Sequence, residues 1–169
     1  MNKALFLDRD GVINHDHRYV NQISDFEFMP GIFEVTKYFQ DLGYLIIVVT
    51  NQGGVSKGYY KLSDLENITD WMISQFSDKG ITISKVYYET SFDENHPRRK
   101  PNPGMFIDAI KEFNVDPSSS LMVGDKTSDL IAAYKAGIKK NIFLNGKYPF
   151  TEVDFKVEKV DSLFQILKT

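Results

Sequence analysis

Residues 4–11, with the sequence ALFLDRDG, carry the pattern on which the fold of this chain depends. Four apolar residues, Ala4–Leu7, stand directly before two carboxylates, Asp8 and Asp10. A short and wholly apolar run is typical of a strand that is buried on both faces of a sheet. The run therefore predicts a central strand, and the acidic pair predicts a polar loop at its carboxyl end.

Similar apolar runs recur along the chain and alternate with segments of helical periodicity. Such alternation favours an α/β fold in which a central parallel sheet lies between two layers of helices. We see no internal repeat and no linker between domains. The predicted strands are Ala4–Leu7, Leu45–Val49, Val86–Tyr88, Leu121–Val123 and Ile142–Leu144.

Capping residues indicate where the helices begin and end. Gly43 is a typical stop signal after the first helical segment. Ser63 and Glu66 have the spacing of a capping box at the start of the second. Asn102 and Pro103 are typical of the N-cap and first residue of the third. The two remaining predicted helices are shorter and end at Gly137 and near Leu167.

The composition is that of an ordinary globular protein. The chain has 169 residues, of which 42% are hydrophobic, and a net charge of −3, so we expect a single domain spanning residues 1–169. This charge disfavours nucleic acid as a partner. The absence of cysteine excludes disulfides, a cysteine nucleophile and cysteine-ligated metals. Since no apolar run is long enough for a signal peptide or a membrane span, we expect a soluble, cytoplasmic protein without membrane contact.

Polar residues follow four of the predicted strands. Ligands of open α/β sheets bind beyond the carboxyl ends of the strands, which meet at one edge. Lys100, just ahead of a predicted helix, can reach the same edge. We therefore expect one site there. The strand-end segments are Asp8–Asp10, Thr50–Gln52, Glu89–Thr90 and Gly124–Lys126.

Three carboxylates, those of Asp8, Asp10 and Asp125, would crowd this edge and repel one another unless a cation lies between them. Each alone would be an ordinary turn residue, but together, beside Thr50 and Lys100, they favour a functional site. A donor set made only of oxygen favours Mg²⁺ over zinc. Mg²⁺ held by few protein ligands commonly binds a phosphate oxygen, so the pattern indicates phosphoryl transfer. One carboxylate could attack phosphorus and a second could move the proton.

Four segments resemble the motifs of the haloacid dehalogenase (HAD) superfamily of phosphatases, and they occur in the family's order. The resemblance implies a three-layer, Rossmann-like HAD core with a central parallel sheet. Val12 stands where the family usually has threonine, a variation that we do not interpret as loss of activity. The matching segments are Asp8–Ile13, Val48–Gln52, Lys100 and Gly124–Asp129.

The same resemblance implies a role for each matching residue. Asp8 would be the nucleophile and Asp10 the general acid and base. Mg²⁺ would be held by the carboxylates of Asp8 and Asp125 and by the backbone carbonyl of Asp10. Thr50 and Lys100 would orient the phosphoryl group and neutralise its charge.

Longer strings resemble the D-glycero-D-manno-heptose 1,7-bisphosphate phosphatases and the related histidinol-phosphate phosphatases. They include Asp16–Val20, Thr50–Gly54 and Arg99–Met105. This resemblance implies a small phosphorylated sugar as substrate and favours the 7-phosphate of the heptose bisphosphate. The substrate contacts that it implies are Asp16, His17, Arg18, Tyr19, Thr50, Asn51, Gln52, Gly53, Arg99, Lys100 and Lys126.

Two features set limits on this resemblance. Such phosphatases typically carry a zinc loop with cysteine and histidine ligands before the Arg-Lys-Pro string, but residues 89–98 contain no cysteine and a single histidine, His96. We therefore expect no zinc, and the exact substrate is left open. The 42 residues from Asp8 to Thr50 and the 50 from Thr50 to Lys100 leave no room for a cap domain, so we expect a capless enzyme with an open site.

Other functions remain as alternatives at this stage. Histidinol phosphate, another small phosphate ester or a nucleic-acid 3′-phosphate end would keep the mechanism and change the substrate. A phospho-receiver-like regulatory module, which is a different class of protein, uses a similar set of residues. Its aspartyl phosphate must persist, however, and Asp10 would speed its hydrolysis. We expect a monomer or a small homo-oligomer.

Overall fold

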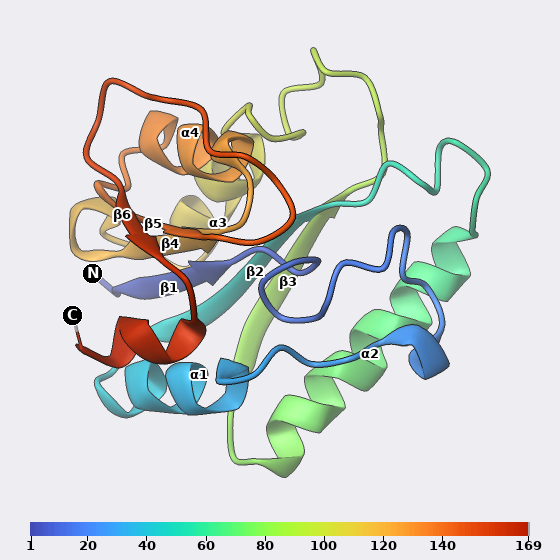
Figure 1. The fold of residues 1–169 in the computed structure, drawn as a ribbon, viewed down its shortest axis with the longest axis horizontal. Coiled ribbons are helices and arrows are strands. Elements are labelled where there is room, and N and C mark those ends of the chain that lie inside the picture. Colours follow the sequence, from blue (N-terminus) through green and yellow to red (C-terminus); the bar gives the residue numbers. More distant parts are fainter. Residues whose placement is uncertain (169) are drawn as a thin grey trace.

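Six parallel strands form the central sheet of the computed structural model, which describes residues 1–168 (Figure 1). Their order across the sheet is β3-β2-β1-β4-β5-β6, which places β1 near the middle. The strands are β1 Ala4–Leu7, β2 Leu45–Asn51, β3 Ile83–Glu89, β4 Leu121–Gly124, β5 Lys140–Leu144 and β6 Glu158–Val160.

Helices cover both faces of the sheet because successive strand residues point to opposite sides. In β1, Leu5 and Leu7 belong to the core beneath α1, α2 and the C-terminal 3-10 helix η3, whereas Ala4 and Phe6 belong to the core beneath α3 and α4. Figure 1 shows these two helical layers on opposite sides of the sheet. The helices are α1 Ile32–Asp41, α2 Leu62–Asp78, α3 Gly104–Glu112 and α4 Thr127–Lys135, with 3-10 helices η1 Ile23–Asp25, η2 Pro117–Ser119 and η3 Leu163–Lys168.

The order of the strands reverses between β1 and β4. From β1 the chain proceeds through β2 and β3 to one edge of the sheet, and from β4 through β5 and β6 to the other. The connections that leave the two neighbouring strands therefore diverge, which opens a crevice beyond their carboxyl ends. At this point the backbone N–H of Asp8 donates to the carbonyl of Val123 at 3.2 Å, so Asp8 and Asp125 emerge side by side.

The α/β class and all five predicted strands are confirmed. The sixth strand, β6, was not predicted because its three residues include two charged ones and show no apolar run. The segment predicted as a last helix is the 3-10 helix η3. Within residues 1–168, no helix has the length and apolar content needed to cross a membrane.

Two predicted helix starts are wrong, by two residues in α2 and by one in α3. Helix α2 begins at Leu62, so the predicted pair Ser63 and Glu66 lies inside the helix. Its N-cap is Lys61, whose backbone N–H donates to Asp64 Oδ2 at 2.9 Å. Helix α3 has Pro103 as its N-cap and begins at Gly104. The side chain of Asn102 instead donates to two backbone carbonyls of the preceding loop. In both places a competing hydrogen bond, invisible to spacing rules, decides the boundary.

The core between α3 and the sheet offers a test of the packing. Phe106 is fully buried, and its ring centroid lies 5.2 Å from that of Phe6 in β1. We expect Phe106→Ala to lower the free energy of unfolding by about 3–5 kcal/mol, because it removes an aromatic side chain and leaves a cavity. Ile107, its neighbour on the exposed side of α3, is 51% accessible, and Ile107→Ala should change that free energy by less than about 1 kcal/mol. Urea unfolding of both variants measures the difference, and equal losses would contradict the assignment of these two faces.

Candidate active site

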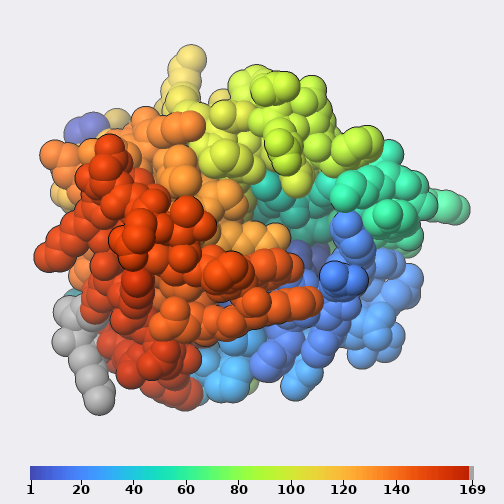
Figure 2. Space-filling view, turned by 45° about the horizontal axis from the view of Figure 1, so that its top comes forward, coloured from blue at the N-terminus to red at the C-terminus, as the bar shows by residue number. Residues whose placement is uncertain are grey.

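A cavity of about 890 Å³ lies beyond the carboxyl ends of β1, β2, β3 and β4. Asp8 and Asp10 line it from the loop after β1, Gln52 from the loop after β2, and Lys100 from the loop after β3. Asp129 contributes from the first turn of α4. Figure 2 shows the cavity as a hollow between the segments coloured blue, green and orange. The predicted meeting of the loops after β1, β2 and β4 with Lys100 is therefore observed, whereas Glu89 and Thr90 are not among the lining residues.

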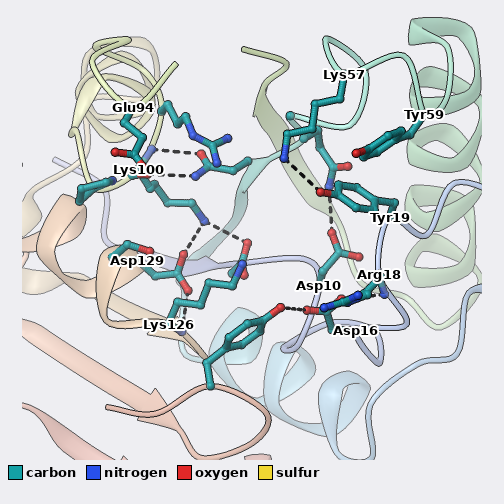
Figure 3. Close-up of a pocket in the computed structure, with 18 of the residues that line it drawn as sticks. Asp10, Asp16, Arg18, Tyr19, Lys57, Tyr59, Glu94, Lys100, Lys126 and Asp129 are labelled. Carbon is teal, nitrogen blue, oxygen red and sulfur yellow. Dashed lines mark hydrogen bonds and ion pairs between the residues drawn. The ribbon is translucent and has the colours of Figure 1, made fainter. Parts of the chain in front are cut away.

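The ammonium group of Lys100 is buried at the floor of this cavity. Its Nζ donates to Asp8 Oδ1 at 3.0 Å, to Asp129 Oδ1 at 2.8 Å and to the carbonyl of Val49 at 2.8 Å, so all three donors are used. Figure 3 shows the bond from Lys100 to Asp129. Burial alone would lower the pKa of Lys100, but the carboxylates of Asp129 and Asp8 outweigh it and raise this pKa. Lys100 is thus a permanent cation at the floor of the site.

Three buried carboxylates compete for this single cation. One oxygen from each of Asp8, Asp125 and Asp129 lies within 4.8 Å of the others. Burial, and then the neighbouring charges of Asp8 and Asp129, raises the pKa of Asp125 to about 10. Burial, and then the charge of Asp129, raises the pKa of Asp8 to about 6 although Lys100 opposes the shift. The cluster has more negative charge than the protein neutralises.

A divalent cation fits this cluster. Asp125 Oδ1 is buried and has no hydrogen-bond partner, and every donor in the cluster is a carboxylate oxygen. Hard cations such as Mg²⁺ prefer such ligands. Gly11 makes room for the carboxylate, because a Cβ at this residue would lie 1.9 Å from Asp125 Oδ2. Both oxygens of Asp129 are already engaged, by Lys100 Nζ and by the backbone N–H of Lys126, so Asp8 and Asp125 are the residues left to hold the ion.

The carboxylate of Asp10 lies outside that cluster and is held by three donors. Its Oδ1 accepts from Arg9 Nη2 at 2.8 Å and from Asn14 Nδ2 at 3.0 Å, and its Oδ2 accepts from Gln52 Nε2 at 3.0 Å. Arg9 is itself buried and also donates to the carbonyl of Val20. Hydrogen bonds to a charged acceptor are strong and directional. Asp10 therefore faces the cavity in a fixed orientation, separate from the three buried carboxylates.

Gln52 connects Asp10 to the second motif. Its Nε2 also donates to Thr50 Oγ1 at 2.9 Å, while its Oε1 accepts a hydrogen bond from the hydroxyl of Tyr60. Because the tyrosine hydroxyl occupies the oxygen, the amide nitrogen must face Asp10 and Thr50. Sequence reasoning missed Tyr60 and Arg9. A basic residue between two carboxylates was a signal for Arg9, whereas the sequence offers none for Tyr60.

The predicted substrate contacts have different surroundings. Asp16, Arg18, Tyr19, Gly53 and several others line the cavity. Asn51 also lines it, but its side chain donates to the carbonyl of Lys100 and accepts from the N–H of Lys100, both at 3.0 Å. His17 is not among the lining residues, and its Nε2 lies 3.2 Å from Glu27 Oε2 on the surface. The structure thus brings most of these residues together, whereas His17 and the buried Thr50 are not among the residues that line the cavity.

The rim of the cavity is rich in positive charge. Four basic side chains line it without an ion pair to any carboxylate among residues 1–168: Arg18, Lys57, Arg99 and Lys126. Lys57 was not predicted, and its Nζ lies 3.2 Å from the hydroxyl of Tyr19. Unpaired cations at the mouth of a cleft attract anions. The cavity therefore suits a ligand that carries phosphate.

The chain is similar to known phosphatases over nearly its whole length. The model of the HAD-hydrolase-like family matches residues 97–167. The D-glycero-beta-D-manno-heptose-1,7-bisphosphate 7-phosphatase of Pasteurella multocida is 37% identical, covering 99% of this chain and 98% of its own. The D-glycero-alpha-D-manno-heptose-1,7-bisphosphate 7-phosphatase of Campylobacter jejuni is 46% identical, covering 85% of this chain and 83% of its own.

A solved structure gives the same result for the fold. The D,D-heptose 1,7-bisphosphate phosphatase of B. bronchiseptica, in complex with magnesium and phosphate, superposes with a TM-score of 0.84 at 25% identity. The match covers 98% of each chain. The similarity therefore includes the sheet, both helical layers and the loops that carry the site.

The unneutralised charge of the cluster yields a prediction about stability. The ordinary pKa of an aspartate is near 3.8, whereas Asp125 in the metal-free fold keeps its proton up to a pH of about 10. Since the folded chain binds the extra proton between these values, the metal-free fold loses stability as the pH rises through this window. We expect Asp125→Asn to raise the melting temperature of the metal-free protein, by more at pH 8 than at pH 5.

Magnesium provides the complementary measurement. Added Mg²⁺ should raise the melting temperature of the unmodified protein and leave that of Asp125→Asn unchanged, because a ligand that binds only the folded state stabilises it. Asp70→Asn, at an exposed position of α2, is the matched control and should behave like the unmodified protein. A full Mg²⁺-dependent shift in Asp125→Asn would contradict the assignment of this cluster as the metal site.

Proposed function

Because the chain belongs to the heptose bisphosphate phosphatases of the HAD superfamily, we propose that its substrate is D-glycero-D-manno-heptose 1,7-bisphosphate, from which it removes the 7-phosphate. It is a phosphoric monoester hydrolase, as its relatives are. The observation that carries the proposal is a buried acidic cluster, anchored by Lys100, at the floor of a cavity whose rim holds four unpaired cations. A substrate with phosphate at both ends matches the unpaired cations at the rim and, at the floor, Lys100 together with the divalent cation that Asp8 and Asp125 would hold.

In the proposed reaction Asp8 is the nucleophile. An oxygen of its carboxylate forms a bond to phosphorus while the bond from phosphorus to the sugar oxygen breaks, and Asp10 gives its proton to that departing oxygen. Asp10 then takes a proton from water, whose oxygen attacks phosphorus and releases Asp8 and inorganic phosphate. When bound at Asp8 and Asp125, Mg²⁺ would supply positive charge close to the transferred phosphoryl group.

The hydrogen bonds of the site support these roles. Lys100 fixes the side chain of Asp8 through Oδ1 and places its own charge beside the nucleophile. Gln52, Arg9 and Asn14 orient Asp10 over the cavity. Thr50 lies in β2, which pairs with the nucleophile's strand β1, and its hydroxyl, held by Gln52, would orient a phosphoryl oxygen. Preorganised donors of this kind supply most of the stabilisation in phosphoryl transfer.

The proposal includes a single catalytic domain over residues 1–169 that works without a cap and without zinc. In the cysteine-free segment 89–98, four side chains each accept a hydrogen bond from the backbone N–H two residues further on: Glu89, Ser91, Asp93 and His96. These bonds organise the loop and occupy the Nδ1 atom of His96. A small phosphorylated sugar as the partner, no nucleic acid, a monomeric or small homo-oligomeric state and a cytoplasmic location complete the proposal.

A substrate panel tests the proposed specificity. We expect Mg²⁺-dependent release of phosphate from an anomer of heptose 1,7-bisphosphate to exceed that from histidinol phosphate and from a 3′-phosphorylated oligonucleotide in kcat/KM by at least about a hundredfold. A zinc chelator too weak to remove Mg²⁺ should leave the rate unchanged. Preference for another substrate would refute the proposed one, and inhibition by the chelator would refute the zinc-free site.

Substitution of the two catalytic carboxylates tests the mechanism. Asp8→Asn should lower kcat by more than about a thousandfold, because an amide cannot form the aspartyl phosphate. Asp10→Asn should slow turnover and let phosphoenzyme accumulate, because water is no longer activated. Mass spectrometry after rapid quenching measures the added phosphoryl group. Normal turnover in Asp8→Asn, or no phosphoenzyme in any variant, would overturn covalent catalysis.

A further inference from the structure

Tyr148 lies between two of the residues for which we expect contact with the substrate. It belongs to the connection from β5 to β6 and lines the cavity. Its hydroxyl donates to Asp16 Oδ2 at 2.8 Å, and the Nζ of Lys126 lies 4.5 Å from the centroid of its ring. Asp16 comes from the loop after β1, and Lys126 is the N-cap of α4. One tyrosine thus contacts two charged groups from segments distant in sequence.

Asp16 is held by several contacts besides this one. Its Oδ1 accepts from the backbone N–H of Arg18 at 3.0 Å, and the ammonium of Lys147 lies 3.4 Å from its backbone carbonyl. Burial alone would raise the pKa of Asp16, but the bonds from Tyr148 and Arg18 outweigh it and lower this pKa. Asp16 is therefore an ionised acceptor whose position depends on Tyr148, and such an acceptor suits a hydroxyl group and repels phosphate.

Lys126 has the opposite chemistry on the same wall of the cavity. Its side chain is exposed and makes no ion pair with a carboxylate among residues 1–168. The face of an aromatic ring attracts an ammonium group but leaves its charge unneutralised. Lys126 therefore stays available to an anion. Figure 3 shows Lys126 and Asp16 on one side of the cavity, away from Lys57 and Tyr59 on the other.

We propose that Tyr148 is a specificity-determining residue that positions Asp16 and Lys126 to bind the leaving group of the substrate. Its hydroxyl positions Asp16, which accepts from a hydroxyl group of the sugar, and its ring positions Lys126, which binds a phosphate on the same sugar. The inference rests on the proposed function and deepens it, because Tyr148 would favour leaving groups that carry both a hydroxyl group and a phosphate. Tyr148 acts on binding of the leaving group and leaves the phosphoryl transfer at Asp8 unaffected.

Two variants separate the hydroxyl from the ring. Tyr148→Phe removes only the hydrogen bond to Asp16, whereas Tyr148→Leu also removes the aromatic ring that the ammonium of Lys126 contacts. With heptose 1,7-bisphosphate we expect KM to rise about five- to tenfold in Tyr148→Phe and further in Tyr148→Leu, with kcat within about twofold of the unmodified value. With p-nitrophenyl phosphate, whose leaving group has neither phosphate nor an aliphatic hydroxyl, kcat/KM should stay within about twofold in both.

The chain offers a matched control on the same two segments. Tyr134 lies in α4, the helix whose N-cap is Lys126. Its ring stacks on that of Phe155, which belongs to the β5–β6 connection that also carries Tyr148, with ring centroids 4.2 Å apart. It is not among the cavity-lining residues. Tyr134→Phe should leave KM for the bisphosphate and for p-nitrophenyl phosphate unchanged. An equal rise of KM in this control would mean that the effect comes from packing and would overturn the proposal.

The remaining outcomes distinguish this inference from the proposed function. Calorimetry in the Asp8→Asn background gives the dissociation constant of the bisphosphate without turnover, and we expect Tyr148→Phe to weaken it by a factor similar to the rise in KM. Equal dissociation constants, or an equal loss with p-nitrophenyl phosphate, would overturn the role of Tyr148. Absence of phosphate release from the unmodified protein on every substrate would instead overturn the proposed function.

Discussion

The ion pairs of the buried Lys100 hold the catalytic part of this molecule together. A charged ammonium with almost no exposure is stable only where carboxylates and carbonyls replace its water, and Asp8, Asp129 and Val49 supply them. These partners come from the end of β1, from α4 and from β2, so one side chain ties three elements to the loop after β3. The same interaction is incomplete, because Asp125 adds a further buried carboxylate, and the excess of negative charge suits a divalent cation.

The position of this cluster follows from the topology of the sheet. A parallel sheet brings the carboxyl ends of its strands to one edge, and the reversal of strand order between β1 and β4 keeps that edge free of crossing connections. Small residues then let the loops approach closely. A Cβ at Gly124 would lie 2.5 Å from the Cβ of Asp129, so the first turn of α4 can pack against the end of β4 only beside glycine. The charges meet because the backbone permits the approach.

The parts of the site that sequence could predict are those that depend on strand ends alone. Asp8, Asp125 and Lys100 stand directly beyond buried runs or ahead of a helix, and their convergence needs no knowledge of loop conformation. Gln52 and Asn51 could be placed at the edge, but not oriented. Their amides make hydrogen bonds to Tyr60 and to the backbone of Lys100, over separations of up to 49 residues. Tyr148 depends on a contact across 132 residues. Spacing rules carry no information about such contacts. They also give no signal for β6, which has no apolar run.

The forces that hold the floor of the cavity differ from those that hold its rim. At the floor, charges are paired in a buried environment where loss of one partner is costly, which restricts variation of Asp8, Asp129 and Lys100. At the rim, Lys57 lies over the exposed ring of Tyr19 and Lys126 over the half-buried ring of Tyr148, contacts that contribute about 1 kcal/mol or less. Under the proposed function, substitutions at the rim would therefore change which leaving group binds, at small cost to folding and without disturbing Asp8. In the capless enzyme that we propose, the rim loops are therefore the part of the site that would select among phosphorylated sugars.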